Sequence, residues 1–224
     1  MMKEYVELKI KILDDVLRKF PDFRVLMREV KDVRVSEIGP GLEEFKEDVY
    51  AEVRHGFTLE GLKDEPVLRA YRNFFWRIGV DPTKVRPAAE ALIRRVLGGR
   101  SIPRINTVVD AYNLASMMTC IALAAFDTNR LNGDIIMRFA KKGEEFLGIG
   151  MDKPVILTGG EVVMTDASRL LAIYPHRDAE YSKITKQTND LIIISCGVPG
   201  IPVDRLREAV DKAYNFIDKF CSES

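Results

Sequence analysis

Residues 103–127 read PRINTVVDAYNLASMMTCIALAAFD, and this stretch decides the fold. Its first part carries Asn106, Asp110 and Asn113 at spacings of four and three residues, which places their side chains on one face of a helix. The residues that can bury the opposite face are apolar: Val108, Val109, Ala111 and Leu114. Asn and Asp are weak helix formers, because their side chains compete for backbone hydrogen bonds. The polar face therefore either ties the helix to neighbouring loops or lines a polar cleft.

The chain after this helix changes to short apolar segments separated by glycine-rich turns, a pattern typical of strands. Strands are predicted at 121–125, 134–139, 145–147, 154–157, 162–165, 170–174 and 191–195. The pairs Asn132-Gly133 and Gly159-Gly160 are typical of tight hairpins. Segment 191–195 is apolar almost throughout, which predicts a central strand. The fold class is therefore α+β, with a mixed or antiparallel sheet or a barrel-like core flanked by helices.

The first half of the chain and its end are mainly helical by spacing. Helices are predicted at 4–20, 42–54, 66–78, 87–97 and from 202 onward, with one strand within 23–38. The aromatic-rich helix 66–78, Trp76 included, is expected deep in the core. A polar linker at 58–65 divides the chain into an N-terminal segment, 1–65, packed on a main domain, 66–224.

Composition excludes several classes of protein. The 224 residues are 46% apolar and 30% charged, which excludes general disorder. The formal net charge is zero, so any basic surface is local and no DNA partner is expected. No apolar run of about 18 residues occurs, and the N-terminus is too charged for a signal peptide, so we expect a cytoplasmic protein without a membrane partner. Three widely spaced cysteines and two distant histidines predict no disulfide framework, no metal and no cofactor.

The motif NxVVDxxN, followed by an apolar run that ends in Phe126-Asp127, resembles the B3/B4 domain of the phenylalanyl-tRNA synthetase β subunit. Further segments are similar to free-standing B3/B4 proteins: Gly-Val-Asp-Pro (79–82), Arg86-Pro87, Glu90-Ala91-Leu92 and Pro-His-Arg-Asp (175–178). The similarity runs from about residue 66 to about residue 202, and the catalytic parts for aminoacylation are absent. The resemblance implies a B3/B4 fold, binding of tRNA, and editing, which is hydrolysis of mischarged aminoacyl-tRNA.

The chain departs from the editing pocket that the resemblance implies. The synthetase domain has a histidine two residues before the Phe-Asp mark, where this chain has Ala124. Its Gly-Gly loop corresponds to His176-Arg177, and the glutamate that recognises the tyrosine hydroxyl is replaced by Ile193 or Ile194. A tyrosine hydroxyl buried against isoleucine would stay unpaired, at a cost of about 1–3 kcal/mol. Tyrosyl-tRNA is therefore not the expected substrate.

An aminoacyl ester is activated, so a site that places water and polarises the carbonyl can hydrolyse it without a covalent nucleophile. We expect three catalytic residues: His176 as general base, with Asn113 and Asp166. Residues expected to contact the substrate are Asn106, Asp110, Thr165, Arg177 and Asp178.

Asn106 and Asp110 are expected to hydrogen-bond to the loops that carry Thr165 and His176. Activity should fall as the imidazole protonates, near its reference pKa of about 6.5. The alternative for residues 176–178 is an Arg177–Asp178 surface pair beside a solvated histidine.

A basic cluster lies between the two predicted helices that precede the motif and continues up to it. It predicts contacts to phosphates of a tRNA acceptor end from Arg86, Arg94, Arg95, Arg100 and Arg104. The alternative is an ordinary solvated helix face. Three functions stay open: a free-standing hydrolase of mischarged aminoacyl-tRNA, a non-catalytic tRNA-binding module, or a protein that binds a small molecule such as a free amino acid.

Overall fold

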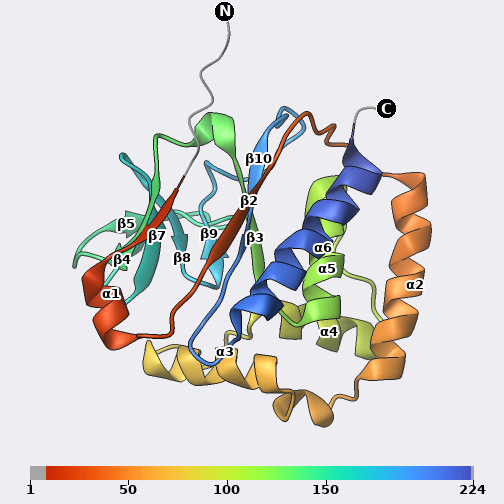
Figure 1. Cartoon of the computed structure of the whole chain (residues 1–224), viewed down its shortest axis with the longest axis horizontal. Coiled ribbons are helices and arrows are strands. Elements are labelled where there is room, and N and C mark those ends of the chain that lie inside the picture. The colour runs from red at the N-terminus through yellow and green to blue at the C-terminus, as the bar shows by residue number, and fades with distance from the viewer. Residues whose placement is uncertain (1–8, 223–224) are drawn as a thin grey trace, which may run out of the picture.

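The central sheet of the computed structural model, which describes residues 9–222, has three strands (Figure 1). Strand β10 (Leu191–Ser195) lies between β2 (Leu26–Val30) and β3 (Leu123–Asp127) and is antiparallel to both. All five residues of β10 are buried, as its apolar sequence requires. The prediction of a central strand here is confirmed.

A second sheet has five strands in the order β1-β4-β7-β8-β9. Their bounds are β1 (Ile10–Ile12), β4 (Ile135–Phe139), β7 (Val162–Thr165), β8 (Leu170–Ile173) and β9 (Arg177–Asp178). Strand β1 is parallel to β4, and the other pairs are antiparallel. Strands β5 (Glu145–Phe146) and β6 (Val155–Ile156) form a separate pair. The α+β class with mixed and antiparallel sheets is confirmed, and neither large sheet closes into a barrel within the described residues.

Helices cover the side of the three-stranded sheet away from the five-stranded one (Figure 1). They are α2 (Pro40–Gly56), α4 (Ala88–Leu97), α5 (Thr107–Thr119) and α6 (Val203–Cys221), with α3 (Pro66–Arg77) crossing at the base of the view. The short helices are α1 (Asp14–Lys19), η1 (Gly61–Lys63) and η2 (Thr128–Arg130). Helix α6 packs against α5 and the three-stranded sheet through an apolar stripe: Leu206, Ala209, Val210, Ala213 and Ile217.

Several predicted elements are wrong. The helix expected at 4–20 is, in its described part, strand β1 followed by the short α1, because Ile10–Ile12 pair with Ile135–Met137. The strand expected within 23–38 is limited to β2, and Asp32, two residues after its end, has a φ of 54° that strands do not adopt. Residues 4–8 of the predicted helix lie outside the described residues.

The two predicted hairpins are also wrong. Asn132-Gly133 precedes β4, whose sheet does not contain β3, and Gly159-Gly160 joins β6 to β7, which lie in different sheets. Helix α3 is buried along one face as expected, but Trp76 lies outside that face and is 58% exposed. No helix within residues 9–222 has the length and apolar content needed to cross a bilayer.

Candidate functional site

Asn106 serves as the N-cap of α5. Its backbone is extended, and its Oδ1 accepts a hydrogen bond of 2.9 Å from the backbone N of Val109. Its Nδ2 donates to the carbonyl oxygen of Ile184 at 3.4 Å. Both polar ends of this buried side chain are therefore used to fix the start of the helix.

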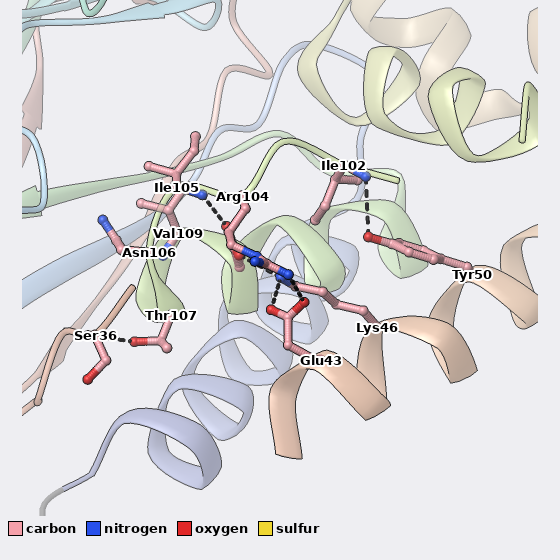
Figure 2. Close-up of polar contacts among 11 residues, drawn as sticks. Ser36, Glu43, Lys46, Tyr50, Ile102, Arg104, Ile105, Asn106, Thr107 and Val109 are labelled. Carbon is pink, nitrogen blue, oxygen red and sulfur yellow. Dashed lines mark hydrogen bonds and ion pairs between the residues drawn. The ribbon is translucent and has the colours of Figure 1, made fainter. Parts of the chain in front are cut away.

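Asp110 is locked into a chain of alternating charges between α2 and α5. Its Oδ2 lies 2.6 Å from Lys46 Nζ, and its Oδ1 accepts from the backbone N of Ile105 at 3.1 Å. Lys46 also contacts Glu43, which accepts in turn from Arg104 at 2.8 Å (Figure 2). Burial would lower the pKa of Lys46, but the hydrogen bonds with Asp110 and Glu43 raise it.

This cluster leaves neither Asn106 nor Asp110 for the contacts expected from the sequence. The predicted hydrogen bonds from these two residues to the loops of Thr165 and His176 are wrong, because their partners belong to other segments. Asn113, one turn further along α5, is half-buried and has no side-chain hydrogen bond within the described chain.

Thr165 and Asp166 hold the turn between β7 and β8. The Asp166 carboxylate accepts from the backbone N of Asn132 at 2.9 Å and from those of Ser168 and Arg169 at 2.8 Å. Burial tends to raise the pKa of Asp166, but these donors outweigh it and lower the pKa. Thr165 donates to the carbonyl oxygen of Arg169 at 2.6 Å. Both side chains therefore have structural partners.

A cavity of about 80 Å³ lies where the two large sheets meet, beside the start of α4. Its lining is Ala88, Leu123, Ala124, Met164, Ala172, Cys196 and the segment 174–178. Of the predicted site residues, the structure brings His176, Arg177 and Asp178 together here. Asn106, Asp110, Asn113, Thr165 and Asp166 are not part of this lining.

One wall of the cavity is held by two buried tyrosine hydroxyls. Tyr71 of α3 donates to the carbonyl oxygen of Cys196 at 2.6 Å and accepts from the backbone N of Ala122 at 3.0 Å. Tyr174 donates to the carbonyl oxygen of Gly197 at 2.6 Å. A Cβ on Gly197 would lie 2.3 Å from a backbone oxygen, so only glycine fits. The segment after β10 is thus a fixed wall.

The turn after β8 explains how three consecutive residues border one cavity. In a straight strand neighbouring side chains point to opposite faces. Here the chain turns after Ile173, whose carbonyl oxygen accepts from the backbone N of His176 at 3.0 Å, before β9 begins at Arg177. The His176 ring packs edge-on against Phe75, with centroids 5.8 Å apart.

His176 has a free nitrogen in this enclosed position. Its Nδ1 is buried and has no hydrogen-bond partner among the described residues. Burial lowers the pKa of His176 to about 4, and the charge of Arg177 acts in the same direction. The imidazole is therefore neutral near pH 7 and available as a proton acceptor.

Asp178 also lacks a partner. Within the described chain no hydrogen bond or ion pair reaches its half-buried carboxylate, and Arg177 instead donates to the carbonyl oxygen of Ile149 at 3.2 Å. Burial raises the pKa of Asp178 to about 7, with Arg177 partly opposing this shift. The alternative of an Arg177–Asp178 surface pair beside a solvated histidine therefore does not describe this segment.

Two residues near the cavity were missed from the sequence. Burial raises the pKa of Tyr112 of α5, and the charge of Asp178 adds to this shift, so the two groups lie near each other. Cys196 was predicted to be a small core residue; it is buried, and it also borders the cavity. Their positions in the sequence could have indicated them, since Tyr112 lies inside the quoted motif and Cys196 directly follows the central strand.

A larger hollow of about 460 Å³ lies beside the pair β5–β6 and includes Thr165 in its lining. Most of its charged and polar groups have partners within the hollow or beside it. Arg138 contacts Glu144 at 2.6 Å, and the Tyr181 hydroxyl donates to Asp166 at 3.4 Å. The smaller cavity, with two unpartnered titratable side chains, is therefore the better candidate site.

The basic residues before the motif divide into engaged and free side chains. Arg94 pairs with the buried Glu90 at 2.7 Å, and Arg104 pairs with Glu43. Burial would raise the pKa of Glu90, but Arg72 and Arg94 lower it. Arg95 donates to the carbonyl oxygen of Ser101. Of the five arginines predicted to contact phosphates, Arg86 and Arg100 are exposed and have no ion pair with another described residue.

No group of three or more His, Cys, Asp or Glu side chains in the described part of the chain is arranged to hold a metal ion.

Comparisons with known proteins agree with the resemblance in the sequence. The phenylalanine–tRNA ligase beta subunit of Thermotoga maritima is 37% identical over 90 residues, which are 40% of this chain and 11% of the subunit. The Yersinia pestis subunit is 26% identical over 195 residues, 87% of this chain and 24% of the subunit. The matches thus span less than a quarter of these relatives.

A solved structure shares the fold. It is an N-terminal fragment of the phenylalanyl-tRNA synthetase beta subunit from Pyrococcus horikoshii, with a TM-score of 0.52 and 12% identity, covering 96% of this chain and 49% of that one. The sequence profile of the B3/4 domain matches residues 70–222. This chain therefore belongs to the B3/4 domain family.

Proposed function

We propose that this chain binds the acceptor end of an aminoacylated tRNA and hydrolyses mischarged aminoacyl-tRNA without being part of a synthetase. Family membership and the similarity to phenylalanine–tRNA ligase beta subunits support the tRNA-related role. One observation carries the proposal further. Ala124 and His176-Arg177, the positions that correspond to the implied editing pocket, border one cavity, and the imidazole of His176 has no partner there.

In this proposal His176 is the general base. Its imidazole takes a proton from a water molecule as the water oxygen attacks the ester carbonyl carbon. The bond from that carbon to the ribose oxygen then breaks, and the imidazolium returns the proton to the leaving ribose oxygen. The cavity of about 80 Å³ has room for several water molecules, at about 15 Å³ each, or for one water and a small aminoacyl group.

Arg86 and Arg100 are the candidate phosphate contacts of this proposal. Arg86 lies two residues before Ala88, which borders the cavity, and Arg100 follows the other end of α4. A ten-residue helix is about 15 Å long, so the two side chains flank α4 at both ends. Arg94 and Arg104 are expected to contribute less, because their guanidinium groups already bind carboxylates.

The expected pH profile differs from the one that an unperturbed histidine predicts. Since burial lowers the pKa of His176 to about 4, the base stays neutral across the physiological range. The activity loss due to imidazole protonation is therefore expected near pH 4 rather than near the reference value of about 6.5.

The test is deacylation of a panel of mischarged tRNAs, with binding of uncharged tRNA measured in parallel. We expect hydrolysis of at least one mischarged tRNA, and a loss of about 10²–10⁴-fold in His176→Ala with tRNA affinity unchanged. The control variant is His55→Ala, which changes the exposed histidine near the end of α2. Full activity in His176→Ala would exclude His176 as the base.

The replacements at Ala124 and Ile193 or Ile194 favour a second candidate, the non-catalytic tRNA-binding module. It predicts salt-dependent tRNA binding and no deacylation with any member of the panel. Absence of both tRNA binding and deacylation would instead favour a small-molecule-binding protein.

A further inference from the structure

We infer that the cavity accepts aminoacyl groups with a small side chain and a free α-ammonium group, and that the Asp178 carboxylate binds this ammonium. The inference rests on the proposed function, because it names the substrate class of the same site. It follows from the size of the cavity, the fixation of its walls and the charge of its one unpartnered acid.

Size limits the side chain. Pockets for drug-sized ligands measure about 300–1,000 Å³, whereas this cavity measures about 80 Å³. Met164 and Tyr174, each 1% exposed, fill the space on the side of the core. The side chains of glycine, alanine and serine have two heavy atoms or fewer and fit beside a water molecule. An aromatic ring does not.

The walls on the side of the core are fixed, so the cavity cannot deepen without breaking the core. The Tyr174 ring packs against Phe23 and Phe74, with centroids 5.1 and 6.4 Å away, and its hydroxyl is bonded to Gly197. The Tyr71 hydroxyl fixes the backbone of Cys196 and of Ala122. Because packed interiors resist displacement, a larger aminoacyl group has no low-energy way to enter.

The negative charge of Asp178 favours a ligand with an α-ammonium group. The Asp178 carboxylate has no partner in the described chain, and the Arg177 guanidinium is directed to Ile149 instead. His176 is neutral near pH 7, so the charged groups of the lining are Asp178 and Arg177, and these two side chains form no ion pair with each other. An α-ammonium would supply a charge-assisted hydrogen bond and repay the burial of the carboxylate.

The first test uses alanyl-tRNA, N-acetyl-alanyl-tRNA and phenylalanyl-tRNA as substrates. We expect hydrolysis of alanyl-tRNA at least about 10-fold faster than of either other substrate, which corresponds to about 1.4 kcal/mol. In Asp178→Asn the free and acetylated substrates should be cleaved at equal rates. Equal cleavage of all three substrates by the unaltered protein would overturn the inference and leave the proposed function standing.

A binding measurement separates the two claims, because it needs no catalysis. The probe is 3′-alanylamino-adenosine, whose amide link resists hydrolysis, compared with its N-acetyl form. Tighter binding of the free amine, lost in Asp178→Asn, supports the ammonium site even if no tRNA is deacylated. Two results would overturn the ammonium site. One is equal binding of the free amine and its N-acetyl form to the unaltered protein, and the other is a preference for the free amine that is unchanged in Asp178→Asn.

Size is tested at the mouth and at the floor of the cavity. Ala88→Leu should narrow the mouth and slow alanyl-tRNA hydrolysis, whereas Ala91→Leu, exposed on the same helix outside the lining, should not.

Met164→Ala should enlarge the cavity and raise the rate on phenylalanyl-tRNA relative to alanyl-tRNA. Its control is Met137→Ala, equally buried and paired with Met164 in the sheet but outside the lining. Unchanged rate ratios in Ala88→Leu and Met164→Ala would contradict the size limit.

Discussion

The N-terminal end of α5 and the cavity between the sheets contain similar residue types in opposite states. At α5, Asn106, Asp110 and Lys46 are buried, and each has its polar atoms bound to named partners. In the cavity, the buried His176 Nδ1 and the half-buried Asp178 carboxylate have no partners among the described residues. Buried polar groups are normally satisfied, so an unsatisfied group needs another explanation. The comparison separates residues that hold the fold from residues that are available to a ligand.

The largest expected effect breaks the satisfied region. Asp110→Ala leaves the Lys46 ammonium buried without its main partner, so the free energy of unfolding should fall by about 3–5 kcal/mol. Denaturant titration measures this change. Lys186→Ala, which removes an exposed ion pair with Glu37, is the control and should leave the free energy of unfolding nearly unchanged. A loss for Asp110→Ala no larger than for the control would show that the α5 cluster does not hold the fold.

The cavity predicts an effect on the free energy of unfolding that depends on pH. The folded-state pKa of Asp178 is raised from 3.8 to about 7, so its contribution to stability is present below about pH 4 and is lost as the pH rises to about 7. Asp178→Asn removes this loss and should gain stability relative to the unaltered protein over that rise.

His176 predicts the opposite sign. Its folded-state pKa is lowered from 6.5 to about 4, so its contribution is present above about pH 6.5 and is lost as the pH falls to about 4. His176→Gln should therefore gain relative stability over that fall. Denaturant titrations at several pH values between about 4 and 7 measure both differences. If the difference in free energy of unfolding between each variant and the unaltered protein does not change with pH, the two groups are solvated.

The smallest expected effect applies the same comparison to the arginines. Arg86→Ala or Arg100→Ala should weaken tRNA binding for every tRNA sequence and lower the slope of log K against log salt by roughly 1. Arg94→Ala should change the slope less, because Arg94 is bound to Glu90. The measurement is a salt titration of tRNA affinity. A larger slope change for Arg94 than for Arg86 and Arg100 would contradict this assignment.

Local patterns in the sequence predicted the elements whose signals are local. Helical spacing located α2 to α6, and the apolar run 191–195 identified the central strand. Strand β1 was missed, because it is defined by pairing Ile10 with Ile135, far along the chain. The hairpin predictions failed because glycine pairs mark turns but do not say which strands then pair.

The site was predicted in part for the same reason. Residues 176–178 form a continuous segment, and the turn before them brings them to one cavity. The partner of Asp110 is Lys46, 64 residues earlier, which no local pattern connects to it, so a structural cluster resembled a cleft. Tyr112 and Cys196 carried no chemical signal of their own, since an isolated tyrosine or cysteine in an apolar segment normally indicates core.

The most direct test measures the deacylation rate and the free energy of unfolding in the same two variants, His176→Ala and Asp110→Ala. We predict that His176→Ala loses about 10²–10⁴-fold in deacylation with little loss of stability. Asp110→Ala should lose about 3–5 kcal/mol of stability and keep the activity of its folded fraction. Deacylation lost in folded Asp110→Ala and retained in His176→Ala would contradict the account, because catalysis would then depend on the satisfied cluster and not on the cavity.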